Sequence, residues 1–213
     1  MKAMKLQLAF DTFDLETALD LAQRTRDFVD IYEIGTPFAL EYGMEAVRRF
    51  RRAFPDKTIL ADLKVMDAGK LEVSAAFRAG ANDVTVLALA DALTIRECVE
   101  SANRFGGKIV ADLICVPDIP SAVHRLEELG VHGIAVHTGV DRQRSGATPL
   151  EDLRCVKGCS RCAEISVAGG ISLNTIAEYA ALKPDVVIVG GAIASSADPR
   201  EEARRIKAAM GRC

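Results

Sequence analysis

The run Val186-Val187-Ile188-Val189-Gly190 decides the fold, because four large apolar residues follow one another without a polar break. A strand with no polar alternation is buried on both faces, which is typical of a parallel sheet covered by helices. Seven comparable runs precede it, and successive runs start about 21 to 32 residues apart, close to the length of one βα unit. The eight predicted strands are Leu6–Asp11, Val29–Gly35, Thr58–Lys64, Asp83–Ala88, Ile109–Ile114, Gly133–His137, Ile165–Gly169 and Val186–Gly190.

Stretches of helical periodicity lie between the predicted strands. Leu15–Thr25 follows Asp14, a residue type that accepts hydrogen bonds from the first backbone amides of a helix. Pro199–Met210 follows Asp198 and begins with proline, whose fixed φ suits the first helical position. Further helices are predicted at Glu45–Ala53, Ser121–Leu129 and Asn174–Leu182.

The repeated alternation of strand and helix indicates the fold class. Eight repeats in a chain of 213 residues leave no room for a second domain. We therefore predict a single-domain (β/α)8 TIM barrel over residues 1–213. An open, doubly wound parallel sheet is the alternative. The dinucleotide-binding pattern G-x-G-x-x-G does not follow the first predicted strand, which favours the barrel.

The composition excludes several classes of protein. Apolar types make up 49% of the residues, charged types make up 27%, and the formal net charge is −3. This apolar content excludes a disordered chain, and the absence of a basic block disfavours a nucleic-acid partner. The longest apolar stretch, Val186–Ala194, contains a Gly pair and is too short to span a membrane. Because the first residues lack the layout of a signal peptide, we expect a cytoplasmic protein without a membrane partner.

Three of the six cysteines, Cys155, Cys159 and Cys162, cluster in a stretch that we predict to be a loop. Their spacing could suit zinc, but structural zinc usually has four ligands, and the fourth would have to be the terminal Cys213. Without a secretory signal, a disulfide framework is not expected. Free thiols are therefore the favoured interpretation.

Polar residues and glycines stand at the carboxyl ends of the predicted strands, where a (β/α)8 barrel has its active site. Asp62 and Lys64 are two positions apart, so a regular strand would direct both side chains to the barrel interior. Glu33 ends the neighbouring strand. Two carboxylates that lie close together favour a shared cation, and hard oxygen ligands suit Mg²⁺. A salt-bridge network around Lys64 that merely closes the barrel is the alternative.

Two glycine pairs follow the last two predicted strands. Exposed backbone amides at these positions form the usual phosphate site of such barrels, so Gly169, Gly170, Gly190 and Gly191 predict a phosphorylated ligand. His137 ends the sixth predicted strand and could act as a general acid or base near neutral pH. A core histidine bonded to a carbonyl group is the alternative for this residue.

The segment Asp62-Leu63-Lys64-Val65-Met66-Asp67-Ala68-Gly69 matches the D-x-K-x-x-D signature of the orotidine 5′-monophosphate decarboxylase suprafamily. Further segments, including LQLAFD, DIYEIGTPF, AVHTGVDRQ and PDVVIVGGAI, resemble the 3-hexulose-6-phosphate synthase family. The resemblance covers essentially the whole chain and implies a (β/α)8 barrel. It also implies a carbon–carbon lyase that condenses formaldehyde with D-ribulose 5-phosphate to D-arabino-hex-3-ulose 6-phosphate, or runs the reverse, through an enediolate stabilised by Mg²⁺.

The resemblance also implies roles for individual residues. Glu33 and Asp62 would bind Mg²⁺, while Asp11 and Lys64 would orient the sugar hydroxyls and stabilise the enediolate. His137, with Asp112, would move protons, and the two glycine pairs would receive the phosphate. Asp67 would reach the active site of a second subunit, which implies a homodimer.

Two alternative functions stay open. One is a 3-keto-L-gulonate 6-phosphate decarboxylase of the same suprafamily, which usually has Glu and Arg where this chain has Asp112 and Val140. The other is a sugar-phosphate binding protein without catalysis. The presence of Asp62, Lys64 and Asp67 together disfavours the second alternative.

Overall fold

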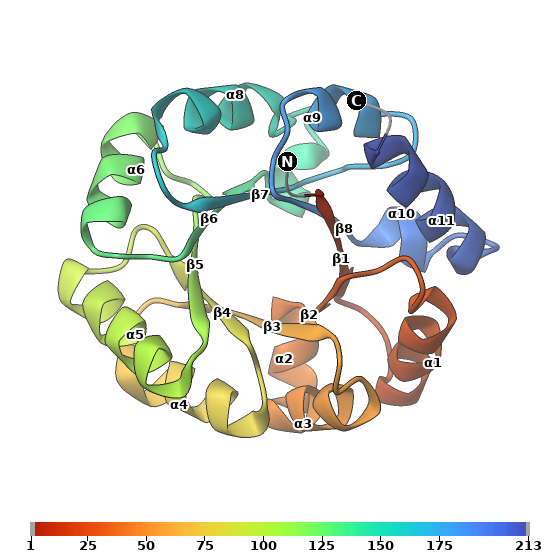
Figure 1. Cartoon of the computed structure of the whole chain (residues 1–213), viewed down its shortest axis with the longest axis horizontal. Helices are drawn as coiled ribbons and strands as arrows, with labels where there is room; N and C mark the ends of the chain where they lie inside the picture. Colours follow the sequence, from red (N-terminus) through yellow and green to blue (C-terminus); the bar gives the residue numbers. More distant parts are fainter. Residues whose placement is uncertain (1–2, 212–213) are drawn as a thin grey trace.

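Eight parallel strands form a closed barrel in the computed structural model, which describes residues 3–211 (Figure 1). Neighbours in the barrel follow the chain order, and β1 pairs in parallel with β8, with Lys5 opposite Val186. This closure confirms the predicted (β/α)8 barrel and excludes the open sheet. The strands are β1 (Lys5–Phe10), β2 (Ile31–Ile34), β3 (Thr58–Val65), β4 (Asp83–Leu87), β5 (Lys108–Asp112), β6 (Gly133–His137), β7 (Glu164–Ala168) and β8 (Val186–Val189).

Helices surround the barrel on the outside (Figure 1). They are α1 (Leu15–Thr25), α2 (Thr36–Tyr42), α3 (Met44–Ala53), α4 (Gly69–Ala79), α5 (Ala92–Phe105), α6 (Ile119–Glu128), α7 (Val140–Gln143), α8 (Leu150–Cys159), α9 (Ile176–Ala181), α10 (Gly191–Ala194) and α11 (Pro199–Met210). As predicted, Asp14 caps α1 by accepting a hydrogen bond from the Thr17 amide at 2.9 Å, and Asp198 caps α11. Five of these helices were predicted from the sequence, namely α1, α3, α6, α9 and α11, whereas α2, α4, α5, α7, α8 and α10 were not.

The cysteine cluster does not lie in a loop, and that prediction is wrong for two of its members. Cys155 and Cys159 belong to α8, whose first residue follows Pro149 without a capping side chain, so the sequence lacks the usual helix-start signal. Cys162 lies beyond the end of α8. Cys213, the fourth possible zinc ligand, lies outside the described residues.

Two apolar layers hold the barrel together. The larger layer fills the space between strands and helices and contains a packed aromatic group, in which Phe10 and Phe50 have ring centroids 5.1 Å apart. The smaller layer lies among the side chains of Ile31, Leu60 and Val186. These three residues occupy strand positions that alternate with positions of the larger layer, so they point into the barrel interior. These apolar side chains line the middle of the barrel interior, and polar groups line its two ends.

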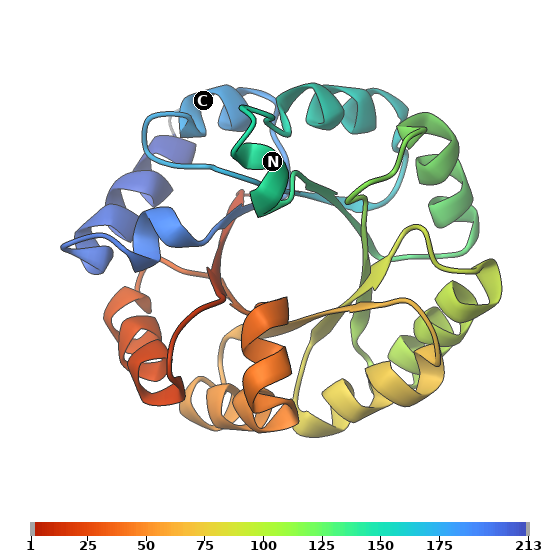
Figure 2. The same ribbon diagram turned by 180° about the vertical axis from the view of Figure 1, so that it is seen from behind.

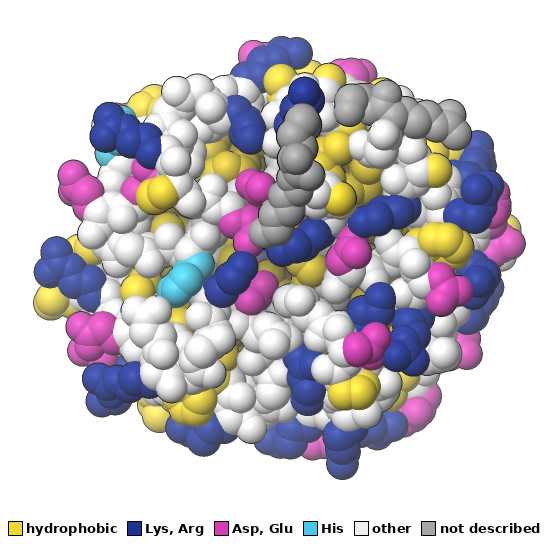
Figure 3. Space-filling model, in the orientation of Figure 1, with side chains coloured by type: hydrophobic (Ala, Val, Ile, Leu, Met, Phe, Trp, Pro, Cys, Tyr) yellow, Lys and Arg dark blue, Asp and Glu magenta, His cyan; other side chains and the backbone are white. Residues whose placement is uncertain are grey.

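The two ends of the barrel differ in character. Figure 2 shows the end at which the strands finish, with α2 and α7 in front of the barrel opening. Figure 3 shows the opposite end, where Lys, Arg, Asp and Glu side chains gather near the centre. There, Glu164 bonds Lys5 at 2.7 Å and Lys108 at 2.8 Å. Within residues 3–211, no helix is long and apolar enough to cross a membrane.

Glu164, Lys5 and Lys108 form an ion cluster at the end of the barrel where the strands begin, and this cluster makes the free energy of unfolding depend on pH. Burial alone would raise the pKa of Glu164, but the hydrogen bonds from Lys108 and Lys5 lower it to about 2, from an ordinary value of 4.5. A carboxylate whose pKa is lower in the folded state stabilises that state above its ordinary pKa, and this contribution is lost as pH falls toward the lower value.

We expect Glu164→Gln to lower the free energy of unfolding by about 1–2 kcal/mol at pH 7 and by roughly half as much at pH 3. Urea unfolding at the two pH values measures the difference. Glu151→Gln, which removes an exposed carboxylate on α8, serves as the control and should change little at either pH. If Glu164→Gln lowered the free energy of unfolding equally at pH 7 and pH 3, the result would contradict the ion cluster assigned to Glu164.

Candidate active site

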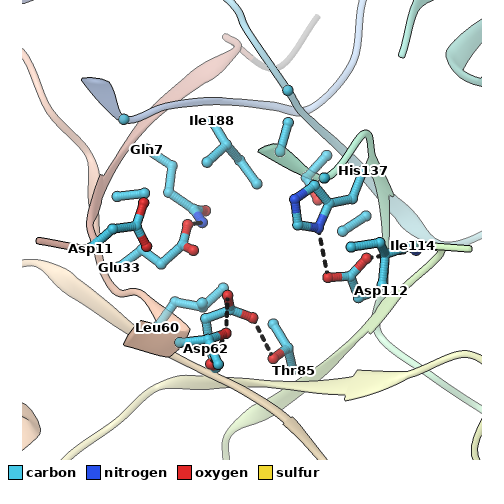
Figure 4. Close-up of a pocket in the computed structure, with 18 of the residues that line it drawn as sticks. Gln7, Asp11, Glu33, Leu60, Asp62, Thr85, Asp112, Ile114, His137 and Ile188 are labelled. Atoms are coloured by element: carbon cyan, nitrogen blue, oxygen red, sulfur yellow. Dashed lines mark hydrogen bonds and ion pairs between the residues drawn. The ribbon is translucent and has the colours of Figure 1, made fainter. Parts of the chain in front are cut away.

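A cavity of about 890 Å³ runs through the barrel interior and includes the carboxyl ends of the strands (Figure 4). Its walls contain all but one of the residues that the sequence analysis assigned to a site. Those lining the cavity are Asp11, Glu33, Asp62, Lys64, Asp112, His137, Gly169, Gly170, Gly190 and Gly191. The structure thus brings together side chains from seven of the eight strands or the loops that follow them. Asp67 is the exception.

Glu33, on β2, is a buried carboxylate beside another carboxylate. Gln7, on β1, donates a hydrogen bond to Glu33 Oε2 at 2.6 Å. Burial, followed by the charge of Asp62, raises the pKa of Glu33 to about 8, from an ordinary value of 4.5. The negative charge at this end of the cavity is therefore not balanced by the surrounding protein.

Asp62 and Lys64 form an ion pair at the end of β3. The sequence analysis expected them to meet because side chains alternate along a regular strand, but the strand is irregular here. The pairing of β3 with β4 shifts between Ala61 and Val65, and Lys64 has a φ of +46°. A non-glycine residue in this left-handed region costs on the order of 1–3 kcal/mol, which other contacts must offset. The predicted contact is thus present, and a bulge produces it.

Hydroxyl groups hold the ion pair from two sides. Thr36, at the start of α2, bonds Asp62 Oδ2 at 2.8 Å and Lys64 Nζ at 3.0 Å. Thr85, on β4, donates to Asp62 Oδ1 at 2.7 Å. Burial would lower the pKa of Lys64, but the charges of Asp62 and Asp112 outweigh it and raise that pKa. Lys64 is therefore a fixed cation in the cavity wall.

Asp112 and His137 form a second pair across the cavity from Glu33 (Figure 4). His137 Nδ1 lies 2.8 Å from Asp112 Oδ2, and the Ile114 amide donates to Asp112 Oδ1 at 2.8 Å. Burial would raise the pKa of Asp112, but the hydrogen bond from His137 and the nearby positive charges lower it. An ionised carboxylate can only accept a hydrogen bond, so His137 Nδ1 carries the proton that it donates to Asp112. Nε2 of His137 is then left to exchange a proton with a ligand.

Asp11 follows β1 and lies close to two glycines. A Cβ atom on Gly35 would overlap the Asp11 carboxylate and the Phe10 carbonyl oxygen, so only glycine lets β1 and β2 end this close together. A Cβ atom on Gly190 would come within 3.8 Å of Asp11 Oδ2. Burial and the charge of Asp62 raise the pKa of Asp11. Asp11 therefore connects the acidic end of the cavity with the glycine pairs.

The two glycine pairs present backbone to the cavity. Gly169 has a φ of +130°, and a Cβ atom there would lie 2.8 Å from the Thr138 carbonyl oxygen, so a side chain is excluded. Gly191 begins α10 and would have no atom within 4 Å of a Cβ. Open backbone amides of this kind suit an anion, so the phosphate assignment stays a prediction that this geometry favours.

Asp67 lies outside the cavity. It is exposed after the end of β3 and lines a groove between α4 and α5 together with Leu71 and Leu93. Within a single chain, Asp67 therefore does not contribute to the cavity. The resemblance assigned Asp67 to a second subunit, and its outward position is compatible with that expectation.

Sequence reasoning missed three residues that organise the site: Gln7, Thr36 and Thr85. Gln7 and Thr85 are each a single polar residue inside an apolar strand, which was an available signal. Thr36 had no comparable signal, because a threonine after glycine is also common where helices start. The bonding partners of all three depend on which residues face each other across strands.

The donor set at Glu33 and Asp62 fits a hard divalent cation. Both are carboxylates, the ligands that Mg²⁺ takes in small numbers while keeping water or substrate oxygens. Burial and the neighbouring Asp62 raise the pKa of Glu33, and a cation beside these two carboxylates would favour their ionised forms. In the part of the chain that the structure describes, no three His, Cys, Asp or Glu side chains form a group that could hold a metal ion, and this includes the cysteines of α8. A cation here would therefore take further ligands from outside this chain's side chains.

Comparison with known proteins identifies the family. The model of the orotidine 5′-phosphate decarboxylase / HUMPS family matches residues 4–206. The 3-hexulose-6-phosphate synthase of Bacillus subtilis is 43% identical over 204 residues, which cover 96% of this chain and 97% of the relative.

Solved structures agree with this result. The crystal structure of 3-hexulose-6-phosphate synthase from Salmonella typhimurium has a TM-score of 0.96 and 47% identity, covering 97% of this chain and 98% of that one. The 3-keto-L-gulonate-6-phosphate decarboxylase from Vibrio cholerae has a TM-score of 0.87 and 28% identity, covering 100% and 99%. The chain therefore belongs to the orotidine 5′-phosphate decarboxylase / HUMPS family and is similar, over nearly its whole length, to the 3-hexulose-6-phosphate synthases.

Proposed function

We propose that the protein is a 3-hexulose-6-phosphate synthase, a lyase that joins formaldehyde to carbon 1 of D-ribulose 5-phosphate and can run the reverse reaction. The observation that carries this proposal is that one cavity holds a His137–Asp112 pair beside a Lys64–Asp62 pair, with Lys64 Nζ 3.6 Å from Asp112 Oδ2. The first pair can move a proton, and the second can stabilise an oxyanion. An aldol reaction of a ketose phosphate needs both.

His137 is the proton carrier in this mechanism. Its Nε2 accepts the proton from carbon 1 of the ketose, which leaves an enediolate. The enediolate carbon then attacks the formaldehyde carbon, and protonated His137 returns a proton to the new alkoxide oxygen. Asp112 orients the ring and stabilises the imidazolium form.

Lys64 and Asp11 orient the substrate. The ammonium group of Lys64 stabilises negative charge on the carbonyl oxygen as the enediolate forms, in a poorly solvated site where electrostatic interactions are strong. Asp11, between the acidic residues and the glycine pairs, accepts hydrogen bonds from sugar hydroxyls.

Glu33 and Asp62 would hold Mg²⁺, which when bound would supply positive charge that stabilises developing negative charge on the substrate. Thr36 and Thr85 fix the Asp62 carboxylate, and Gln7 fixes the Glu33 carboxylate, so both ligands are oriented before substrate arrives.

The glycine pairs after β7 and β8 bind the phosphate through backbone amides, with no positive side chain at Ala192. This fixes the end of the substrate that does not react and so orients carbon 1 toward His137.

We further propose that the protein is a homodimer. Leu71 and Leu93 are 70% and 71% exposed beside Asp67, and Met66 and Leu89 nearby are also exposed. Apolar side chains gathered on one face are typical of a surface that a partner covers. If a second copy covered this face, Asp67 of one subunit would lie toward the cavity of the other subunit.

Decarboxylation of 3-keto-L-gulonate 6-phosphate is the second candidate, because the decarboxylase of Vibrio cholerae has the same fold. Val140 argues against it. This residue is 64% exposed at the cavity mouth, where the resemblance leads us to expect an arginine in a decarboxylase. A valine at this position supplies no positive charge.

A substrate comparison tests the proposed function directly. We expect formaldehyde to be consumed only when D-ribulose 5-phosphate and Mg²⁺ are both present, and a chelator to stop the reaction. Release of carbon dioxide from 3-keto-L-gulonate 6-phosphate is measured in parallel. Faster turnover in the second assay would favour the decarboxylase, and binding of either ester without turnover would favour a binding protein.

Asp62→Ala tests the acidic end of the cavity. We expect kcat to fall about 10³-fold with circular dichroism unchanged, because the variant removes one proposed Mg²⁺ ligand and the partner of Lys64. Asp20→Ala, an exposed aspartate on α1, is the control and should retain full activity. Near-normal turnover of Asp62→Ala in Mg²⁺ would rule out the proposed metal site.

Leu71→Glu tests the proposed dimer. A charge in the centre of the apolar face should produce a monomer in analytical ultracentrifugation and should lower activity, since Asp67 of the second subunit is then lost. Arg205→Glu on α11 changes charge on a different face and should leave the mass unchanged. A wild-type protein that sediments as a monomer would contradict the shared site.

A further inference from the structure

Thr85 lies where β3 departs from regular pairing with β4. Ala61 is opposite Val84, and Val65 is opposite Val86. Three residues of β3, from Asp62 to Lys64, therefore face the single residue Thr85 on β4. Extra residues in one strand form a bulge, and bulges redirect side chains next to active sites. This bulge carries both members of the Asp62–Lys64 ion pair.

The hydroxyl group of Thr85 connects the two ends of the bulge. The Lys64 amide donates a hydrogen bond to Thr85 Oγ1 at 2.9 Å, and Thr85 Oγ1 donates to Asp62 Oδ1 at 2.7 Å. A threonine hydroxyl has one proton to donate, so the direction of both bonds is fixed. The side chain is buried, with 5% of the residue exposed. The hydroxyl group of Thr85 thus gives the Lys64 amide a hydrogen-bond partner in place of the backbone carbonyl group that regular strand pairing would provide.

Thr36 plays a different part. It contacts Lys64 Nζ at 3.0 Å and Asp62 Oδ2 at 2.8 Å, which are the charged groups of both side chains, and it also bonds the backbone carbonyl oxygen of Asp62 at 2.8 Å. Thr85 instead bonds the backbone of Lys64, at the residue whose φ is +46°. It therefore determines the backbone conformation from which the Lys64 side chain turns back toward Asp62.

We propose that Thr85 is a positioning residue, whose hydroxyl group sets the directions of Asp62 and Lys64 by holding the bulge in place. This inference rests on the proposed function for its kinetic consequence. Without the hydroxyl group, the Lys64 amide and Asp62 Oδ1 each lose a partner, and the bulge can relax toward a more favourable backbone conformation. The ammonium and carboxylate groups then leave the positions from which they stabilise the enediolate, while the glycine pairs on β7 and β8 are untouched.

The kinetic test compares Thr85→Val, which keeps the shape without the hydroxyl group, with Thr85→Ser, which keeps the hydroxyl group. We expect Thr85→Val to lower kcat about 10²-fold and to change KM for D-ribulose 5-phosphate by less than about threefold. Thr85→Ser should restore kcat to within about threefold of the wild type. Thr25→Val is the matched control, since it removes another buried hydroxyl group, which donates to the Leu21 carbonyl oxygen in α1.

Two measurements are independent of turnover. Amide hydrogen exchange followed by NMR should show faster exchange at Lys64 in Thr85→Val and no change there in Thr25→Val. Titration with Mn²⁺, followed by electron paramagnetic resonance, should show about tenfold weaker binding in Thr85→Val, as expected when a residue that orients a metal ligand is lost. If Thr85→Val does not fold, Thr85→Ala is compared in the same way.

The outcomes separate the two proposals. Unchanged kcat and unchanged Lys64 exchange in Thr85→Val would overturn the role of Thr85, as would a Thr85→Ser variant as impaired as Thr85→Val. A wild-type protein that does not consume formaldehyde, but whose Lys64 amide and Mn²⁺ binding respond to Thr85→Val, would overturn the proposed function and leave the positioning role supported.

Discussion

The structure of the site depends on the ion pair between Lys64 and Asp62, because it lies among more carboxylates than one ammonium group can balance. Asp11, Glu33 and Asp112 line the same cavity, and Lys64 Nζ is 3.6 Å from Asp112 Oδ2. Burial, followed by the negative charge of Asp62, raises the pKa of Glu33 and of Asp11. A cavity of this kind is ready for positive charge from outside the protein, which is the physical reason for proposing a divalent cation.

This charge cluster depends in turn on a strained backbone. The left-handed conformation of Lys64 interrupts β3 just before Val65, which is buried and returns to register with Val86. The bulge is thus enclosed between two paired residues, Ala61 and Val65, and cannot relax freely along the strand. Strain of this kind persists only where surrounding contacts fix it, and here Thr36 at the start of α2 and Thr85 on β4 supply them.

Most of the fold was predictable, because it follows from local signals. Short runs rich in apolar residues located all eight strands, and aspartate caps located the starts of α1 and α11. The helix α4 was missed for a physical reason: it begins after Ala68, a left-handed residue whose side chain cannot cap the helix. The sequence also predicted which residues belong to the site, because the carboxyl ends of the strands meet at one end of a barrel. The internal bonding of the site was not predictable, because the bulge at Asp62 to Lys64 depends on pairing between strands that are distant in sequence.

The arrangement of the barrel separates binding from chemistry. The glycine pairs follow β7 and β8, the acidic residues lie on or directly after β1 to β3, and the Asp112–His137 pair lies on β5 and β6. A substrate held by its phosphate at the first location therefore extends its reactive end between the other two. The second and third locations are in contact, because Lys64 Nζ lies 3.6 Å from Asp112 Oδ2, so a change in one alters the charge that the other experiences. The Vibrio cholerae decarboxylase, at 28% identity and a TM-score of 0.87, has the same fold, and its name describes a decarboxylation and not the aldol reaction that we propose for this chain.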